Sequence, residues 1–273
     1  MPRHRGTYDP SNLTPYEISR SKVENFIQCP ACFWMDRVKG IKFPSMPKWL
    51  LNTATDTLLK KDFDKFRNLQ VPHPLMEKNG LQDIVPFHHK DIDKWRLSTH
   101  LGLRTEIKDL NLIFGGGLDD VWIHTKTNEL IIVDYKSTAG KKSEDKKRLE
   151  PINLEGSYKK SFKRQMEMYQ WILRQSGFTV KDLSYFLYVN GDQHFAKGML
   201  KESKNSAIMN FEVQFIPYIG DDSWVFDTLQ KVKKCLEQKE CPKHSISGFG
   251  PKGDLPCEYL TFLNGIKSNK LKF

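Results

Sequence analysis

A segment rich in glycine, acidic and apolar residues, GGGLDDVWIHTKTNELIIVDYKST, occupies residues 115–138. Two runs of branched and aromatic residues flank a polar stretch within it, which is the usual pattern of a β-hairpin. With a two-residue loop in the polar stretch, Asp119 faces Asp134 across the two strands. Because side chains alternate between the faces of a strand, both carboxylates then share one face with Lys136. A change of one residue in the loop would break this register.

Two carboxylates and a lysine at the end of an apolar sheet face suggest phosphodiester hydrolysis. Carboxylates in such a place are costly without a counter-charge, and oxygen ligands suit a hard divalent cation. A bound cation polarises a phosphoryl oxygen and lowers the pKa of bound water. Lys136 could orient that water or stabilise developing negative charge. The simpler alternative is that Asp119 and Asp134 are polar strand ends and Lys136 is a solvated tip.

Hydrophobic periodicity predicts the elements that must position these groups. The predicted core elements are, in order, a helix at 48–68, strands at 101–111, 112–124 and 129–136, a helix at 158–175 and a strand at 183–190. Outside them we expect an irregular connection at 69–90, a strand at 208–218, a helix at 223–239 and a loop-rich segment at 241–273.

Three short motifs follow one another along this predicted core. They are Gly116-x-x-Asp119, Asp134-Tyr135-Lys136 and Gln165-x-x-x-Tyr169. In order and spacing they resemble the RecB-like branch of the PD-(D/E)XK nuclease superfamily, which includes CRISPR-associated exonucleases and AddB-type nuclease domains.

The resemblance implies an α/β (α+β) fold with a restriction-endonuclease-like αβββαβ core. A mixed central sheet would be flanked by helices, with helical extensions at both ends of the chain. The whole chain, residues 1–273, would be one nuclease domain with its core at about 48–190. The N-terminal helical segment would be 15–40, and the C-terminal extension of strand, helix and loop would be 208–273.

The resemblance also implies a Mg²⁺ or Mn²⁺ site. Asp119, Asp134 and the backbone carbonyl of Tyr135 would be ligands, with Asp56 of the first helix as a further one. Asp56 stands where members of the family commonly have His or Glu, and a solvated helix residue is the alternative interpretation.

Three further residues receive supporting roles from the resemblance. Lys136 would act on the attacking water or on the transition state. Gln165 and Tyr169, neighbours one helical turn apart, would support the site and position the nucleic acid strand. The alternative for this pair is a core tyrosine with a glutamine at its rim.

The activity implied is hydrolysis of DNA, and exonuclease or flap-type cleavage of single-stranded or end-containing DNA is favoured over sequence-specific cleavage. The chain contains no P-loop motif, so unwinding would need a helicase or a recombination or repair partner. Two alternatives are open. One is a catalytically decayed nuclease core that binds nucleic acid, and the other is a partner subunit whose basic surface docks on an acidic protein.

Composition agrees with a nucleic-acid partner without requiring one. The 273 residues carry a formal net charge of +10, and DNA is preferred here over RNA only by the resemblance. The segment after the predicted active-site strand is strongly basic, and it could contact phosphates or form a solvated loop. Its basic residues are Lys141, Lys142, Lys146, Lys147 and Arg148.

No apolar run is long enough for a membrane span, and the N-terminus does not look like a secretory signal. Five cysteines, an odd number, do not suggest a secreted disulfide scaffold, so we expect a cytoplasmic protein without membrane contact.

The cysteines offer a second candidate metal site. Some RecB-like nucleases hold a 4Fe–4S cluster with one N-terminal and three C-terminal cysteines, and Cys29 matches the N-terminal position. The C-terminal spacing differs from theirs. Zinc could instead use Cys29, Cys32, Cys257 and a fourth ligand such as Cys241 or His244. We favour the interpretation that these are ordinary thiols.

Overall fold

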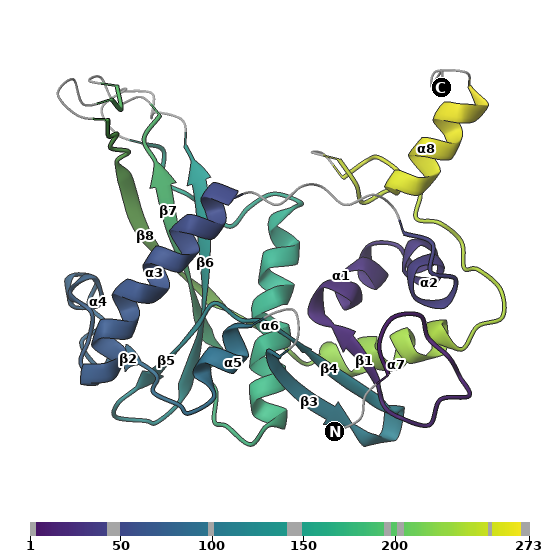
Figure 1. Cartoon of the computed structure of the whole chain (residues 1–273), viewed down its shortest axis with the longest axis horizontal. Coiled ribbons are helices and arrows are strands. Elements are labelled where there is room, and N and C mark those ends of the chain that lie inside the picture. The colour runs from purple at the N-terminus through teal and green to yellow at the C-terminus, as the bar shows by residue number, and fades with distance from the viewer. Residues whose placement is uncertain are drawn as a thin grey trace.

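The computed structural model describes residues 4–42, 50–97, 101–140, 149–193, 198–200, 205–250 and 253–268. Its elements follow one another as shown in Figure 1. They are β1 (Tyr16–Ser19), α1 (Arg20–Gln28), α2 (Pro30–Val38), α3 (Leu50–Leu69), α4 (Pro74–Lys78), β2 (Ile84–Pro86), α5 (Ile92–Arg96), β3 (Leu103–Ile107), the 3-10 turn η1 (Lys108–Leu110), β4 (Leu112–Gly116), β5 (Asp120–His124), β6 (Leu130–Ala139), α6 (Lys159–Gln175), β7 (Leu183–Gly191), β8 (Phe211–Ile219), α7 (Val225–Leu236) and α8 (Glu258–Lys267).

The strands form two mixed sheets. The larger sheet has the order β2-β5-β6-β7-β8, in which β6 and β7 are parallel and the other neighbours are antiparallel. The smaller sheet has the order β1-β4-β3, with β1 parallel and β3 antiparallel to β4. The expected α/β (α+β) fold with mixed strand directions and flanking helices is confirmed, although the strands form two sheets where one central sheet was expected. Its identity as a nuclease core stays a prediction.

The central hairpin has the predicted register. Ile123 pairs with Leu130 and Val121 pairs with Ile132, although the loop between the strands is longer than two residues. The ladder of paired residues stops just before Asp119. The first candidate carboxylate therefore lies at the open end of the hairpin, where β5 begins.

The two faces of the larger sheet pack against different helices, as the alternation of side chains requires. Val121 and Ile132 belong to the core that α6 completes, and Figure 1 shows α6 standing between the two sheets. Trp122 and Ile131 belong to a second core, where Phe63 of α3 stacks on Trp122 with ring centroids 5.3 Å apart. The end of the β5–β6 hairpin is thus held between α3 and α6.

The prediction of one strand at 112–124 is wrong. The chain forms β4 and β5 there, and these strands belong to different sheets. The break follows Gly116, where a Cβ atom would lie 2.9 Å from the Tyr169 hydroxyl oxygen. A bare backbone is needed at this crossing, and an apolar run alone does not reveal such a bend.

The predicted irregular connection at 69–90 is also incorrect, because it contains α4 and β2. Ile84 and Val85 of β2 are buried, and this short strand forms the edge of the larger sheet beside β5. A run of three strand residues is too short for periodicity to reveal. The C-terminal segment that we expected to be loop-rich likewise contains α8.

A buried ion-pair network anchors the hairpin. Asp120 is fully buried; its Oδ1 contacts Arg67 of α3 and accepts a hydrogen bond from Arg96 of α5 at 3.0 Å. Its Oδ2 accepts a hydrogen bond from the Tyr135 hydroxyl at 2.7 Å. Burial by itself would raise the pKa of Asp120, but the two guanidinium groups outweigh burial and hold that pKa below its ordinary value.

We predict that Asp120→Ala lowers the free energy of unfolding by about 3–5 kcal/mol, because it removes the fully buried carboxylate that Arg67 and Arg96 share and leaves them only the more exposed Asp64. Urea unfolding followed by circular dichroism measures this change. Asp62→Ala removes an exposed ion pair with Lys65 and is the matched control, with an expected change below about 1 kcal/mol. Equal effects of both substitutions would contradict the anchoring role.

Candidate active site and cysteine–histidine group

Four of the predicted active-site residues meet at the open end of the hairpin. Asp134 is almost fully buried, and one of its oxygens contacts the ammonium group of Lys136. Its other oxygen accepts a hydrogen bond from Gln165 of α6 at 2.7 Å. Asp119 accepts a hydrogen bond from the backbone N–H of Tyr135 at 2.9 Å. The sheet and α6 therefore hold both carboxylates in defined orientations.

The electrostatics of Asp134 are those of a crowded, dehydrated carboxylate. The pKa of Asp134 is raised to about 7. Burial is the main cause, the ammonium of Lys136 opposes it, and the nearby charge of Asp119 adds to it. A second positive charge placed beside Asp134 would favour its ionised form.

Asp56 joins this group through a lysine that the sequence analysis did not identify. The Nζ atom of Lys60 lies 2.8 Å from Asp56 and 3.9 Å from Asp119, so it bridges the two carboxylates. Burial and the charge of Asp119 raise the pKa of Asp56 above its ordinary value, although Lys60 lowers it. The signal for Lys60 was its position one helical turn after Asp56.

Tyr135 contacts both aspartates of the Asp119-Asp120 pair. Its backbone N–H donates to Asp119, whereas its side-chain hydroxyl donates to Asp120 on the other face of the sheet. The predicted role of its carbonyl group as a metal ligand stays a prediction. Sequence analysis gave no role to Asp120, because an Asp-Asp pair does not show which member faces the core.

Tyr169 positions the bend between β4 and β5 rather than touching either carboxylate directly. Its hydroxyl donates a hydrogen bond to the Gly117 carbonyl, and its ring is buried. Burial raises the pKa of Tyr169 to about 12, with Arg20 opposing and Asp119 adding to the effect. Gln165 and Tyr169 thus hold two different parts of the same site from one face of α6.

The basic residues expected after Thr138 are outside the part of the chain that the structure describes. These are Lys141, Lys142, Lys146, Lys147 and Arg148.

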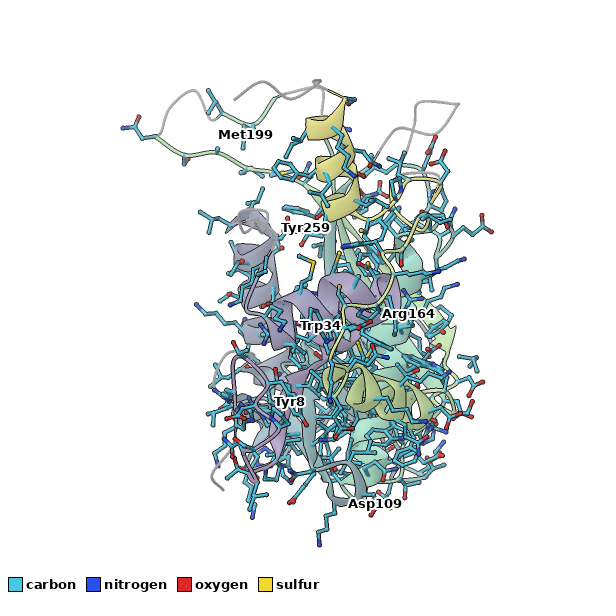
Figure 2. All side chains as sticks on the ribbon, turned by 90° about the vertical axis from the view of Figure 1, so that its right-hand side faces the viewer. Tyr8, Trp34, Asp109, Arg164, Met199 and Tyr259 are labelled. Carbon is cyan, nitrogen blue, oxygen red and sulfur yellow. The ribbon has the colours of Figure 1, made fainter. Side chains whose placement is uncertain are left out.

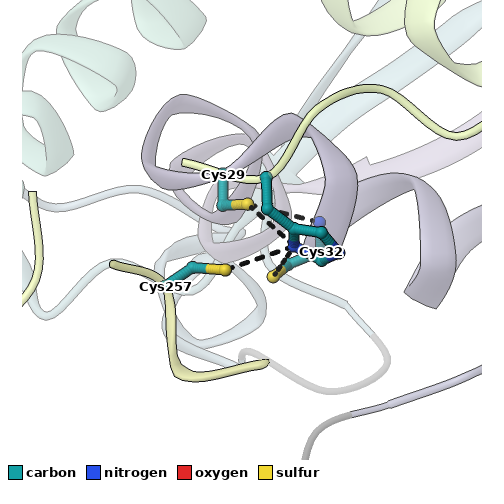
Figure 3. A group of neighbouring side chains, drawn as sticks. Cys29, Cys32 and Cys257 are labelled. Atoms are coloured by element: carbon teal, nitrogen blue, oxygen red, sulfur yellow. Dashed lines mark hydrogen bonds between the residues drawn. The ribbon is translucent and has the colours of Figure 1, made fainter. Parts of the chain in front are cut away.

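The second candidate site is formed by four side chains from the two ends of the chain. The Nδ1 atom of His244 lies 3.8 Å from the Cys29 sulfur, 3.7 Å from the Cys32 sulfur and 3.2 Å from the Cys257 sulfur. All four donor atoms lie within 4.8 Å of one another. Figure 3 shows the three thiol groups converging on one point. This Cys3His group could hold a metal ion such as zinc.

The positions of these donors follow from local structure. Cys29 caps α2, whose first residue is Pro30, as expected for a helix that restarts at a proline. Cys257 precedes α8, which brings the C-terminal segment against α2. Figure 2 shows Tyr259, at the base of α8, on the same side of the molecule as Trp34 of α2.

Cys241 does not belong to the group, contrary to one of the two alternatives for the fourth ligand. Its side chain is exposed and its sulfur contacts the backbone carbonyl of Ala31 at 4.0 Å, so His244 takes the fourth position. The thiols of the group perturb one another. A hydrogen bond between Cys32 and Cys29 lowers the pKa of Cys29 and raises that of Cys32. The interpretation of all these residues as ordinary thiols does not account for the convergence.

Comparison with known proteins adds no identification. No protein-family model matches the chain. No curated protein matches it either. Among the described residues, no helix combines the length and apolar character needed to cross a membrane.

We predict that Gly116→Ala destabilises the fold by about 1–3 kcal/mol, because the new methyl group would lie 2.9 Å from the Tyr169 hydroxyl oxygen. In a Tyr169→Phe background that oxygen is absent, and less than half of the effect should remain. A double-mutant cycle measured by urea unfolding tests this coupling. Simple additivity of the two substitutions would show that the contact does not constrain the bend.

Proposed function

We propose that the protein is a metal-dependent nuclease that hydrolyses DNA phosphodiester bonds. The observation that carries this proposal is the meeting of Asp119, Asp134 and Lys136 at one sheet end, with Gln165 of α6 bound to Asp134. These are the groups whose spacing resembles the RecB-like motifs. The net charge of +10 favours an anionic substrate and supports the same conclusion.

The donor set fits a hard divalent cation, for which Mg²⁺ and Mn²⁺ are the candidates. Asp56, Asp119 and Asp134 supply carboxylate oxygens, the ligands such ions prefer. One oxygen of Asp56 is buried and has no hydrogen-bond partner among the described residues, and the buried Asp134 oxygen that Gln165 does not bind contacts the Lys136 ammonium. The ammonium groups of Lys60 and Lys136 balance the carboxylates here, which indicates how strongly this pocket favours positive charge.

A bound cation would polarise the scissile phosphoryl group and make a water molecule more acidic. The residues of this chain would perform the remaining tasks. Gln165 fixes the Asp134 carboxylate by donating to one oxygen, and the Tyr135 N–H fixes Asp119. Lys136 can swing from Asp134 to stabilise negative charge that develops on the phosphate. Tyr169 keeps the backbone of the β4–β5 bend in place through Gly117.

We predict that wild-type protein degrades end-labelled DNA with magnesium or manganese and not with EDTA. Lys136→Ala and Asp134→Asn should each lower the rate by at least about a hundredfold, because each removes a charge that acts on the reacting groups. Labels at the 5′ and 3′ ends, on single-stranded and duplex DNA, report polarity. Lys126→Ala, at the opposite end of the same hairpin, is the control and should keep full activity.

Activity that persists in Lys136→Ala would contradict the assignment of the site. Wild-type protein that binds DNA or RNA and cuts neither would favour a decayed core that only binds nucleic acid. Cleavage of RNA but not DNA would support the assigned active site and show that the substrate is RNA.

For the Cys3His group we propose a structural zinc ion. A tetrahedral zinc with sulfur and nitrogen ligands separates these atoms by about 3.6 Å, close to the observed 3.2, 3.7 and 3.8 Å. A 4Fe–4S cluster places iron and sulfide atoms between its ligands and so needs donors that are farther apart. Cys29 and Cys257 are buried, which suits a closed structural site.

We predict that the purified protein contains about one zinc ion per chain. His244→Ala and Cys257→Ser should lose the zinc and lower the melting temperature by about 4–8 °C, which corresponds to ~2 kcal/mol for a chain of this size. Metal analysis by mass spectrometry and thermal unfolding provide the two measurements. Cys241→Ser is the matched control and should retain both metal and stability. Iron and sulfide in the sample would show that the group holds an iron–sulfur cluster and not zinc.

A further inference from the structure

A cavity of about 620 Å³ lies next to the candidate active site, and the proposed catalytic residues do not account for it. Its wall combines the start of α3, the end of β6, the start of α6, one residue of β7 and the segment 150–153. Lys136 belongs both to this wall and to the carboxylate group. A volume of this size is typical of sites that hold a small organic ligand.

Strand register makes the cavity an extension of the carboxylate face. In the parallel β6–β7 pair, Lys136 lies beside Tyr188 and Thr138 lies beside Asn190. With period-two alternation, these side chains are on the same face as Asp134. A ligand in the cavity would therefore lie along the same sheet face as the reacting groups.

One wall residue is a buried cation without a carboxylate partner. Lys159 is only 8% exposed, and its ammonium donates to the backbone carbonyl of Asn153. The same ammonium lies 5.6 Å from the ring centroid of Tyr158 and 5.8 Å from that of Tyr188. No carboxylate of the described residues forms an ion pair with it. A buried charge in this condition is costly and favours an anionic ligand.

Aromatic groups and one unsatisfied hydroxyl group line the same cavity. Tyr158 is 63% exposed and meets Phe162 edge to face, with centroids 6.0 Å apart. The Tyr188 hydroxyl and the Asn190 amide are buried and have no hydrogen-bond partner in the described part of the chain. Asn190 packs against Gly140 of the cavity wall, where a Cβ atom would lie 2.6 Å from its nitrogen.

An anion site, a stacking surface and the unsatisfied Tyr188 hydroxyl in one cavity match the chemistry of a nucleotide. We propose that the cavity receives one unpaired nucleotide of the strand that is cut, with a phosphate on Lys159 and the base against Tyr158. That the nucleotide belongs to the strand being cut rests on the proposed nuclease function. A base in a duplex is paired and stacked and would have to leave the stack to enter, so the cavity selects single strands and frayed ends.

The test measures binding rather than cleavage. Calcium replaces magnesium, and fluorescence anisotropy compares a single strand of about 16 nucleotides with a blunt duplex of the same sequence. Wild type should prefer the single strand by about tenfold. Lys159→Met should weaken single-strand binding by about fivefold and reduce the slope of log affinity against log salt by about 0.7, the value for one phosphate contact. Lys160→Met, at the exposed neighbouring position, should change neither.

Tyr158→Ala provides a second variant, and its exposed side chain makes it harmless to folding. One abasic nucleotide is moved along the strand. The affinity of wild type should fall about fivefold when the abasic nucleotide occupies one particular position, because the missing base is the one that stacks on the Tyr158 ring. Tyr158→Ala lacks that ring and should show no loss at that position. The melting temperature of Lys159→Met should equal or exceed that of wild type, since the substitution removes an unpaired buried charge.

Equal affinity for single strand and duplex would overturn the proposal. So would a parallel loss of both affinities in Lys159→Met, or an abasic profile that Tyr158→Ala leaves unchanged. These outcomes are separate from those of the cleavage experiment. Metal-dependent cleavage without a preference for single strands would support the nuclease function and contradict the proposed role of the cavity. Single-strand binding without cleavage would support the role of the cavity and contradict the nuclease function.

Discussion

Asp120 is fully buried and ion-paired with Arg67 and Arg96, and this pairing fixes the direction of its neighbour Asp119. Successive side chains of a strand point to opposite faces. Once the two arginines hold Asp120 on the α3 side, Asp119 must point toward the carboxylate cluster. The position of α3 is fixed by the same network, because Arg67 belongs to that helix. One ion-pair network therefore orients the first carboxylate and places Asp56 and Lys60 beside it.

The cluster itself is a balance between desolvation and positive charge. Burial raises the pKa of Asp134, and its ionised form depends on Lys136. Lys60 forms ion pairs with Asp56 and Asp119. Under the proposed function, the two ammonium groups would move aside when a divalent cation binds. Fixed carboxylates and exchangeable counter-charges would then suit a site that admits both a cation and a phosphate.

The sequence was most informative where local rules decide the outcome. The register of the β5–β6 hairpin followed from the alternation of side chains, although its loop is longer than predicted, and the long helices α3 and α6 followed from periodicity. The split between β4 and β5 could not be foreseen, because it depends on the contact of Gly116 with Tyr169, far away in the chain. The role of Asp120 was missed for the same reason. Its arginine partners come from α3 and α5.

The Cys3His group likewise combines a part that local sequence predicts with a part that depends on distant contacts. Spacing identified Cys29-x-x-Cys32 as half of a metal site, yet it could not decide between Cys241 and His244. That choice depends on how the C-terminal segment packs on α2, a contact between residues more than two hundred positions apart. Linking the chain ends in this way closes a very long loop, and such closures restrict the unfolded chain strongly in theory.

Lys159 shows how stability and function can oppose each other in this fold. An ammonium group that is buried without a carboxylate lowers the stability of the folded chain, and an apolar side chain of similar length would avoid that cost. Its two aromatic neighbours offset only part of it. Lys136, by contrast, has Asp134 as a partner. A phosphate that enters between the two lysines would meet Lys159, which has no carboxylate partner among the described residues, and Lys136, which must first leave Asp134. Binding would then draw Lys136 away from Asp134 and leave that carboxylate ready for a cation, so that strand and metal would each favour the binding of the other.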